Sequence, residues 1–477
     1  MIGFLGCDIG TTGTKTMLFD EQNVAVGRGY KGYELLTPKE SFYEQRCEDW
    51  YDSLKISIKE AVKDSDLDVK ALSLSAQGGS FFLADLDSDG KVIPLCNALT
   101  WMDTRGASEF KEVQKYLGVD EVYEKTGWRL SGGSAICRIF WLKKYAPEIF
   151  SRTKIILSTS DYIYYRLTGK LVIDYTSAAM MANFNVNEKA YDKKILSVLG
   201  LGEEMLPKLV PTGADLGEIL PDVAKDLGLP EGVRLFAGAH DQYAASLGSN
   251  YFTDKDLVVS TGTTWVIFGN SDKPVFNEYY LAPCVHPRGG YGVITSAVSS
   301  GTVLEWTKNL IGVDFKTLDA EVEKRGVEPE LLVYPFISGN GGYRGRRLKY
   351  AIRNAEYRHD KFDLARATME GVAFEIKQII NLYRDSGIQD QKIIIAGGAA
   401  RSAVWMDILA SVLDKEIYIS NQADRCCFGA FSIAKKGYTG GDFVKFDFDG
   451  HVVSPDKEKA LIYKDKFIKY NEQINNV

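Results

Sequence analysis

The residues best suited to phosphate chemistry gather in one short stretch near the start of the chain. Residues 7–15 read Cys-Asp-Ile-Gly-Thr-Thr-Gly-Thr-Lys between two apolar runs that predict strands, so the glycines and threonines form a hairpin tip. Glycines let backbone amides approach a ligand and threonines add hydroxyl donors, which together suit a polyphosphate. Asp8 fits beside phosphates only if a hard cation such as Mg²⁺ lies between them, bound directly or through water. The alternative is an ordinary hairpin turn.

The same pattern occurs a second time in the chain. Residues 257–270 again read as a strand, a Gly-Thr-Thr turn and a strand. Gly10 and Gly262 lie 252 residues apart (262 − 10), slightly more than half of the chain, which favours a duplicated domain. Two such hairpins facing each other would hold one phosphate chain across a cleft.

Polar side chains follow two further predicted strands. The strand over 233–239 ends in His240-Asp241-Gln242, where a carboxylate lies at a sheet edge and near a helix N-terminus, a usual place for a catalytic acid or base. The alternative role of Asp241 is a helix N-cap. The strand over 69–76 runs into Gln77 and two glycines, which makes Gln77 either a substrate contact or a polar turn residue.

Two more motifs have chemistry suited to a polar ligand. Trp101, Asp103 and Arg105 combine an aromatic ring, an acid and a base that would stack on and hydrogen-bond a polyol; the alternative is a surface salt bridge beside a buried tryptophan. Gly397 and Gly398 follow a predicted strand and permit a flat ligand such as adenosine to lie against the backbone; the alternative is a tight turn. Neither a P-loop nor a Gly-x-Ser-x-Gly elbow occurs, which excludes those two classes.

The elements that position these motifs belong to a globular protein. With 477 residues, 45% hydrophobic and 25% charged, the chain suits two large domains, and no run is long enough for a membrane span. A net charge of −7 argues against a nucleic-acid partner. No signal peptide is evident, so we expect a cytoplasmic protein without a membrane partner. Seven scattered cysteines suggest reduced thiols. Helical periodicity predicts helices over 363–383, with Gly371 in close packing, and over 425–436, closed by Gly437.

In these residues the chain resembles the FGGY carbohydrate kinases of the actin, Hsp70 and hexokinase fold superfamily. The resemblance implies an α/β fold of two ribonuclease-H-like (actin-like ATPase) domains, 1–247 and 248–477, around an interdomain cleft, with the sugar mostly on the first domain and ATP mostly on the second. Seven segments in register carry it: Asp8-Ile-Gly-Thr-Thr, Tyr43-Glu-Gln, Trp101-x-Asp-x-Arg, Gly238-Ala-His-Asp-Gln, Ser260-Thr-Gly-Thr-Thr, Arg366 to Ala373, and Gly397-Gly-Ala-Ala-Arg-Ser.

The resemblance also implies roles for single residues. Asp241 matches the family's catalytic base and Asp8 its Mg²⁺-linked aspartate, and the cofactors are ATP and Mg²⁺. The implied substrate contacts, in a region that includes Glu44 and Gln45, are Gln77, Gly78, Trp101, Asp103, Arg105, Asp241 and Gln242. The implied ATP contacts are Gly10, Thr11, Thr12, Thr14, Lys15, Thr261, Gly262, Thr263, Gly397, Gly398, Ala399 and Ser402.

The implied activity is ATP-dependent phosphorylation of a hydroxyl of a small sugar or polyol, with a ketopentose such as xylulose first and ribulose, fuculose, gluconate, glycerol or erythritol as alternatives. Three departures from the family's patterns leave the sugar open: His240 precedes the base, Ala76-Gln77 replaces a Met-His pair, and Ser338-Gly-Asn-Gly-Gly replaces Ser-Gly-Glu-Arg-x-Pro. A rival is a nucleotide-driven switch of the actin or Hsp70 kind, without sugar transfer. A small-molecule sugar is the expected partner, and a homodimer is compatible with the sequence.

Overall fold

The computed structural model describes residues 1–249, 253, 255–339 and 348–474, and it divides into two compact units. Residues from the second half of the chain contribute to both units. The N-terminal unit comprises Met1–Tyr251, Pro283–Tyr291 and Asp424–Phe446, and the C-terminal unit comprises Phe252–Ala282, Gly292–Ala423 and Asp447–Val477. Most of the loop that begins at Ser338 lies outside the described residues.

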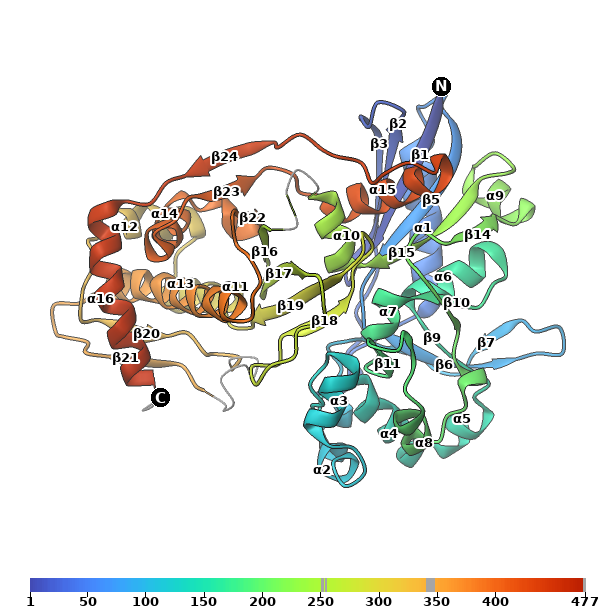
Figure 1. The fold of residues 1–477 in the computed structure, drawn as a ribbon, viewed down its shortest axis with the longest axis horizontal. Coiled ribbons are helices and arrows are strands. Elements are labelled where there is room, and N and C mark those ends of the chain that lie inside the picture. Colours follow the sequence, from blue (N-terminus) through green and yellow to red (C-terminus); the bar gives the residue numbers. More distant parts are fainter. Residues whose placement is uncertain (250–252, 254, 340–347, 475–477) are drawn as a thin grey trace. The chain divides into compact units, whose positions relative to one another are not determined.

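A six-stranded sheet forms the centre of the N-terminal unit (Figure 1). Its order is β14 (Asp215–Glu218), β15 (Arg234–His240), β5 (Asp68–Ala76), β1 (Ile2–Ile9), β2 (Gly13–Asp20) and β3 (Ala25–Gly32). β1 and β2 form the predicted hairpin, whereas β1, β5 and β15 run parallel. Because successive residues of a strand face opposite sides, Leu5 and Cys7 join the cluster around α1 (Cys47–Val62), while Phe4 contacts Phe431 of α15 (Arg425–Thr439).

A smaller sheet in the same unit brings together the segments that carry the expected substrate contacts. β8 (Ala98–Leu99) pairs with both β4 (Glu44–Gln45) and β6 (Phe81–Leu86), so residues 44–45, 77–81 and 98–105 are held close to one another. The other elements of this unit include β7 (Val92–Pro94), α2 (Phe110–Val113), α3 (Val119–Thr126), α4 (Ala135–Tyr145), α5 (Pro147–Arg152), β9 (Ile155–Ser158), α6 (Thr159–Thr168), β10 (Val172–Asp174), α7 (Tyr175–Ala179), β11 (Phe184–Asn185), β12 (Ala190–Tyr191), α8 (Lys193–Leu199), β13 (Lys208–Val210), α9 (Pro221–Leu227) and α10 (Asp241–Gly248).

The sheet of the C-terminal unit repeats the strand order of the first sheet. It contains β19 (Tyr291–Ala297), β17 (Trp265–Ser271), β16 (Leu257–Thr261), β22 (Ile393–Gly397), β23 (Ile417–Ser420) and β24 (Gly450–Val453), in that order. β16 and β17 form the second predicted hairpin, β16, β22 and β23 run parallel, and β24 is antiparallel to β23. The first sheet has the same pattern of parallel and antiparallel pairing, with β1, β2, β5, β15 and β14 in the places of β16, β17, β22, β23 and β24. This agreement supports the duplicated-domain hypothesis.

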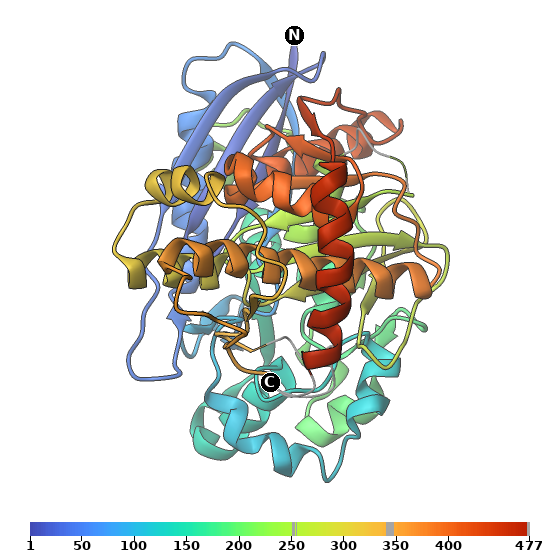
Figure 2. The same ribbon diagram turned by 90° about the vertical axis from the view of Figure 1, so that its left-hand side faces the viewer.

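Helices cover this second sheet, and the long helix α13 (Lys361–Asp385) crosses the C-terminal helix α16 (Lys457–Gln473) in Figure 2. The crossing is fixed by buried hydrogen bonds, because the hydroxyl of Tyr470 in α16 donates to Glu375 of α13 over 2.8 Å. The remaining elements include α11 (Gly301–Ile311), α12 (Phe315–Glu323), β20 (Leu332–Tyr334), β21 (Ala351–Arg353) and α14 (Ala403–Leu413). Within the described residues, no helix combines the length and the apolarity that a membrane crossing needs.

The end of α15 differs from the sequence prediction. The helix continues to Thr439 and ends at Gly440 in the left-handed conformation, with φ of +70°, so the assignment of Gly437 as its closing residue is wrong. Gly437 instead lies inside the helix, where a β-carbon would come within 2.3 Å of the Phe236 ring of β15. The glycine is therefore required for close helix–sheet packing. Cys427 on the same helix is fully buried.

Replacing Gly371 with alanine should destabilise the protein, although alanine is the better helix former by about 1 kcal/mol. A β-carbon at this position of α13 would lie 2.2 Å from the carbonyl oxygen of Val333 in β20, so the helix would have to move. We expect the free energy of unfolding in urea to fall by about 1–3 kcal/mol. Gly326→Ala is the matched control, because a β-carbon at that position would have no heavy atom within 4 Å. Equal stability of the two variants would contradict the packing role.

Candidate active site

The carboxyl ends of three parallel strands bring Asp8 and Asp241 to one edge of the N-terminal sheet. In the order β15-β5-β1, Asp8 is paired with Ser75, and Ser75 is paired with Ala239. Asp241 follows β15 directly and is the first residue of α10. The N-cap position belongs to His240, so the alternative role of Asp241 as the N-cap is wrong. Strand ends in α/β sheets are common ligand sites, and this edge has two carboxylates.

Asp8 is partly buried, and one neutral hydrogen-bond donor holds its carboxylate. The hydroxyl of Ser75 donates to its Oδ1 atom over 2.7 Å. Burial raises the pKa of Asp8 to about 6 against the effect of that hydrogen bond, and the negative charge of Asp241 adds to the rise. The two carboxylates are therefore close enough to repel each other. A divalent cation beside Asp8 would offset this repulsion, so the residues present fit Mg²⁺.

Asp241 lies beside an imidazole. His240 is largely buried, and its Nε2 atom is 3.1 Å from Oδ1 of Asp241, whose side chain remains 32% exposed. The backbone amide of His240 donates to the hydroxyl of Thr176 over 2.8 Å, which fixes the start of α10. A β-carbon at Gly78 would come within 2.5 Å of the His240 ring, so a bare backbone is needed there. Gly78 thus lies directly against His240, and Gln242 is the second residue of α10.

The tip of the first hairpin is tied down from several sides. Tyr33 donates its hydroxyl proton to the carbonyl oxygen of Gly10, and Gln45 Nε2 donates to that of Thr11 over 2.6 Å. Gly10, Thr11 and Thr12 keep exposed surface, as does Lys15, whose Nζ lies 3.3 Å from Oδ1 of Asp424. Thr14 differs from them, because it is fully buried and its hydroxyl is hydrogen-bonded to Ser53 over 2.7 Å. In this hairpin, therefore, Gly10, Thr11, Thr12 and Lys15 have surface that a phosphate could contact.

Of the expected substrate contacts, Asp103 and Arg105 belong to a buried ion-pair cluster, and Trp101 lies two positions before Asp103 in the chain. Asp103 is fully buried and binds the Arg105 guanidinium, which also lies 2.6 Å from Oε1 of Glu44 and 3.8 Å above the Phe42 ring. Trp101 is 51% exposed. The alternative of a surface salt bridge beside a buried tryptophan is wrong in both parts. What remains is an exposed aromatic face beside a rigid polar cluster, an arrangement suited to a polyol.

Two residues of this region were not found from the sequence. Ser75, which holds Asp8, lies in a strand that reads only as buried, and its partner depends on the register between β5 and β1. Arg138 of α4 is buried and donates to the carbonyl oxygens of Gly79 and Thr100, over 2.8 and 2.5 Å. It joins the segment after β5 to the segment that carries Trp101. Its sequence surroundings show only helical periodicity, so no local signal predicts this role.

The residues expected on the ATP side lie at the corresponding edge of the C-terminal sheet. Thr261 at the end of β16 is paired with Gly397 at the end of β22. Gly397 has φ of +123°, and a β-carbon there would be 2.7 Å from the carbonyl oxygen of Thr261, so only glycine fits. Gly262 and Thr263 are exposed at the hairpin tip. The second phosphate hairpin and the glycine pair are therefore neighbours at one sheet edge.

A hollow of about 770 Å³ opens beside this glycine pair. Ser402, between the lining residues Arg401 and Ala403, is the N-cap of α14, where its hydroxyl accepts from the amide of Trp405 over 3.3 Å. Ala399 is partly buried and packs against the core. The volume is within the usual range for a small-molecule site. The residues that line it include Gly397, Gly398, Ala400, Arg401, Ile419, Ser420, Asn421, Gln422, His451 and Val453.

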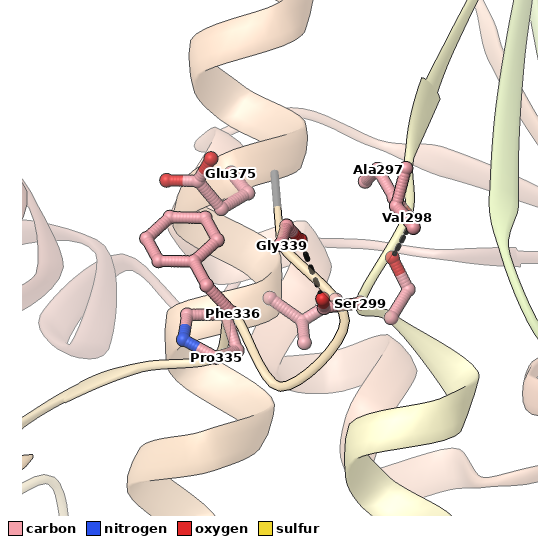
Figure 3. A pocket seen from close by; sticks show the side chains of 9 residues that line it. Ala297, Val298, Ser299, Pro335, Phe336, Gly339 and Glu375 are labelled. Atoms are coloured by element: carbon pink, nitrogen blue, oxygen red, sulfur yellow. Dashed lines mark hydrogen bonds between the residues drawn. The ribbon is translucent and has the colours of Figure 1, made fainter. Parts of the chain in front are cut away.

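A small cavity with a buried acid lies behind the second hairpin (Figure 3). Thr302 donates its amide proton to the carbonyl oxygen of Thr263 over 3.0 Å, which connects the hairpin to the start of α11. Just before it, Ser299 donates to the carbonyl oxygen of Gly339 over 2.6 Å at the wall of the cavity. Glu375 lines the same cavity beside Phe336. Burial raises the pKa of Glu375 to about 8.

The buried Glu375 should make the native state less stable as the pH rises from about 5 to about 8. The ordinary pKa of the glutamate is 4.5 and its native pKa is about 8, so between these values the native state keeps a proton that the unfolded state has released. This stabilisation is complete below the ordinary pKa and is lost as the pH rises toward the native one, by up to about 1.4 kcal/mol per pH unit. Glu375→Gln should remove this part of the slope in urea unfolding.

The control for this slope is Glu231→Gln, which makes the same charge change at an exposed position of the other unit. It should keep the pH dependence of the natural protein. If Glu375→Gln also keeps it, Glu375 is already ionised in the native state at neutral pH.

Comparisons with known proteins agree with this architecture. The family model for the N-terminal domain of the FGGY family of carbohydrate kinases matches residues 3–248, and the model for its C-terminal domain matches residues 257–436. The xylulose kinase of Bacillus subtilis (strain 168) is 25% identical over 443 residues, which covers 91% of this chain and 88% of that protein. The gluconokinase of the same organism is 27% identical over 465 residues, with 93% and 88% covered.

A solved structure supports the same fold along the whole chain. The ligand-bound xylulose kinase from Lactobacillus acidophilus superposes with a TM-score of 0.92 at 23% identity, covering 100% of this chain and 98% of the other. The fold is thus the two-domain α/β architecture of actin-like ATPases. Because both domain models match in order, the chain belongs to the FGGY family of carbohydrate kinases and is an ATP-dependent carbohydrate kinase.

Proposed function

We propose that this kinase transfers the terminal phosphoryl group of ATP to a hydroxyl of a neutral ketose, first of all a ketopentose such as xylulose. The observation that carries the proposal is the pair of carboxylates, Asp8 and Asp241, at one edge of the N-terminal sheet. Several of the relatives are xylulose kinases, and others are gluconokinases, so the family alone leaves the sugar open.

In the proposed mechanism Asp241 accepts the proton of the attacking hydroxyl. Its partly exposed carboxylate and its position after β15 suit a general base. Mg²⁺, when bound near Asp8, supplies charge that offsets the phosphates. Among the described residues, no group of three or more acidic, histidine or cysteine side chains is arranged to hold a metal.

In this mechanism the remaining expected site residues bind ATP and orient its phosphates. The exposed backbone and hydroxyls of Thr11 and Thr12, with Lys15, would bind phosphate oxygens, as would Gly262 and Thr263 in the other unit. Thr261, by contrast, is buried, and its hydroxyl donates to the carbonyl oxygen of Ala396 over 3.2 Å. The hollow beside Gly397 and Gly398 would take the adenosine. Phosphoryl transfer needs little covalent help, so this positioning supplies most of the catalysis.

The charges of the substrate side favour a neutral sugar over a sugar acid. Arg105 is the cation of the buried cluster, and it is already bound to both Asp103 and Glu44. The other buried guanidinium of this region, Arg138, donates to the carbonyl oxygens of Gly79 and Thr100, so both cations are already engaged and neither is offered to a gluconate carboxylate. The exposed side of Trp101 and the partly exposed carboxylate of Glu44 instead offer stacking and a hydrogen-bond acceptor for sugar hydroxyls.

A substrate panel tests this proposal. ADP release should be measured with D- and L-xylulose, ribulose, fuculose, rhamnulose, gluconate, glycerol and erythritol, and without any sugar. We expect the highest kcat/KM with a neutral ketopentose and little turnover with gluconate. A preference for gluconate would contradict the electrostatic argument. ATP hydrolysis that no sugar changes would favour the nucleotide-driven switch. The cytoplasmic location and the homodimer stay predictions.

A further inference from the structure

A closed ring of hydrogen bonds connects the first phosphate hairpin with the substrate side of the N-terminal unit. Gln45 Nε2 donates to the carbonyl oxygen of Thr11 over 2.6 Å, and Gln45 Oε1 accepts from Gln77 Nε2 over 2.8 Å. Gln77 Oε1 accepts from the hydroxyl of Ser80 over 3.3 Å, and the oxygen of that hydroxyl accepts from the backbone amide of Trp101 over 3.1 Å. The indole Nε1 of Trp101 then donates to Oγ1 of Thr11 over 3.1 Å, which closes the ring.

The directions of the three bonds that the two glutamine amides make in the ring follow from one buried indole. Trp50 is fully buried, and its Nε1–H, which can only donate, lies 3.0 Å from Oε1 of Gln45. The atom of Gln45 on that side must be oxygen, so its amide nitrogen faces Thr11. Because Gln45 Oε1 accepts, Gln77 must present its nitrogen to Gln45 and its oxygen to Ser80. Gln45, itself fully buried, therefore sets the orientation of both amides in the ring.

The last bond of the ring determines what the Thr11 hydroxyl can do. A hydroxyl has one proton to donate and two lone pairs. Since the Trp101 indole N–H already occupies a lone pair of Oγ1, the proton of Thr11 is left to donate to another acceptor. A phosphate oxygen is such an acceptor. A sugar stacked on the half-exposed Trp101 would restrict the indole, and the restriction would pass directly to Thr11.

We propose that Gln45 is a positioning residue that couples sugar binding at Trp101 to the phosphate hairpin at Thr11, so that ATP turnover is fast only when a sugar is bound. This inference rests on the proposed function. Gln45 touches neither substrate in this scheme and acts through Thr11 and Gln77. A misplacement of about 1 Å at a reacting group can cost about 10²-fold in rate, so a hairpin that loses its anchor should lose turnover.

The test breaks the ring at two separate places. Gln45→Leu removes the central amide at similar volume, and Trp101→Phe removes the indole N–H but keeps an aromatic face. With the preferred sugar, each should lower kcat by about 10- to 100-fold. Each should also lower the ratio of ADP release with sugar to ADP release without it, a ratio that general destabilisation would leave unchanged. Gln22→Leu, at an exposed turn, is the matched control and should behave like the natural protein.

The double variant Gln45→Leu/Trp101→Phe distinguishes a ring from two unrelated contacts. If both substitutions break one ring, the double variant should be no more than about 2-fold slower than the slower single variant. If the two losses of kcat multiply in the double variant, the coupling is wrong, while the kinase assignment still holds. The same follows if Gln45→Leu leaves the ratio of ADP release with and without sugar unchanged. If Gln45→Leu fails to fold, Trp101→Phe at its exposed position still decides, because an unchanged ratio there overturns the proposal. A natural protein whose ADP release ignores every sugar would overturn both the inference and the proposed function.

Discussion

Replacing Asp241 with asparagine should lower kcat by about 10²- to 10⁴-fold, because an amide cannot accept the proton of the attacking hydroxyl. Asparagine has nearly the same size, so the packing around His240 and the start of α10 should persist. Affinity for ATP should change little, since the expected adenosine and phosphate contacts lie elsewhere. The measurement is ADP release at saturating sugar and ATP, together with ATP binding by calorimetry.

Asp222→Asn is the matched control for this substitution. Asp222 is also in the first turn of a helix, α9, but it is exposed and is not among the expected site residues. The control should retain full turnover and the same melting temperature as the natural protein. Near-normal turnover of Asp241→Asn would show that another group, or water alone, takes the proton.

The motifs that depend on local backbone chemistry could be predicted from the sequence. Both Gly-Thr-Thr turns are hairpin tips, as expected from glycines between two apolar runs. Asp241 lies at a strand end as predicted, because a buried run followed by a polar residue and a helical pattern marks that junction. Its neighbour His240 takes the N-cap position, which shows how one residue of uncertainty at an element boundary changes a residue's role.

What depends on packing between distant segments could not be predicted. Gly437 reads as a helix end, yet the close approach of Phe236, 201 positions earlier (437 − 236), explains why a glycine is there. Exposure is hard to predict for the same reason, because tryptophan is usually buried and ion pairs are usually exposed, whereas Trp101 is half-exposed and Asp103 is buried. The direction of the Gln45 amide depends on a buried contact with Trp50 that only the folded chain creates.

Replacing Asp8 with asparagine should lower kcat by about 10²- to 10³-fold and raise the Mg²⁺ concentration needed for half-maximal rate. Asparagine can still accept the hydrogen bond from Ser75, so the shape of the site is kept and only the charge is lost. Burial and the neighbouring charge of Asp241 both oppose ionisation of the native carboxylate and raise its pKa. A group kept ionised against that cost needs a cation as its partner. Initial rates over a Mg²⁺ titration at fixed ATP would measure both effects.

Ser75→Ala separates charge from orientation in this test. It keeps the Asp8 carboxylate but removes the donor that holds it, so we expect a smaller loss, about 10-fold, with nearly the same Mg²⁺ requirement. Asp89→Asn, at an exposed turn of the same unit, makes the same charge change as Asp8→Asn and should have no effect. If Asp8→Asn lowers kcat without changing the Mg²⁺ requirement, Asp8 acts on the substrates directly and the link to the metal is wrong. If it changes neither, the carboxylate at the end of β1 serves only the fold of the sheet edge.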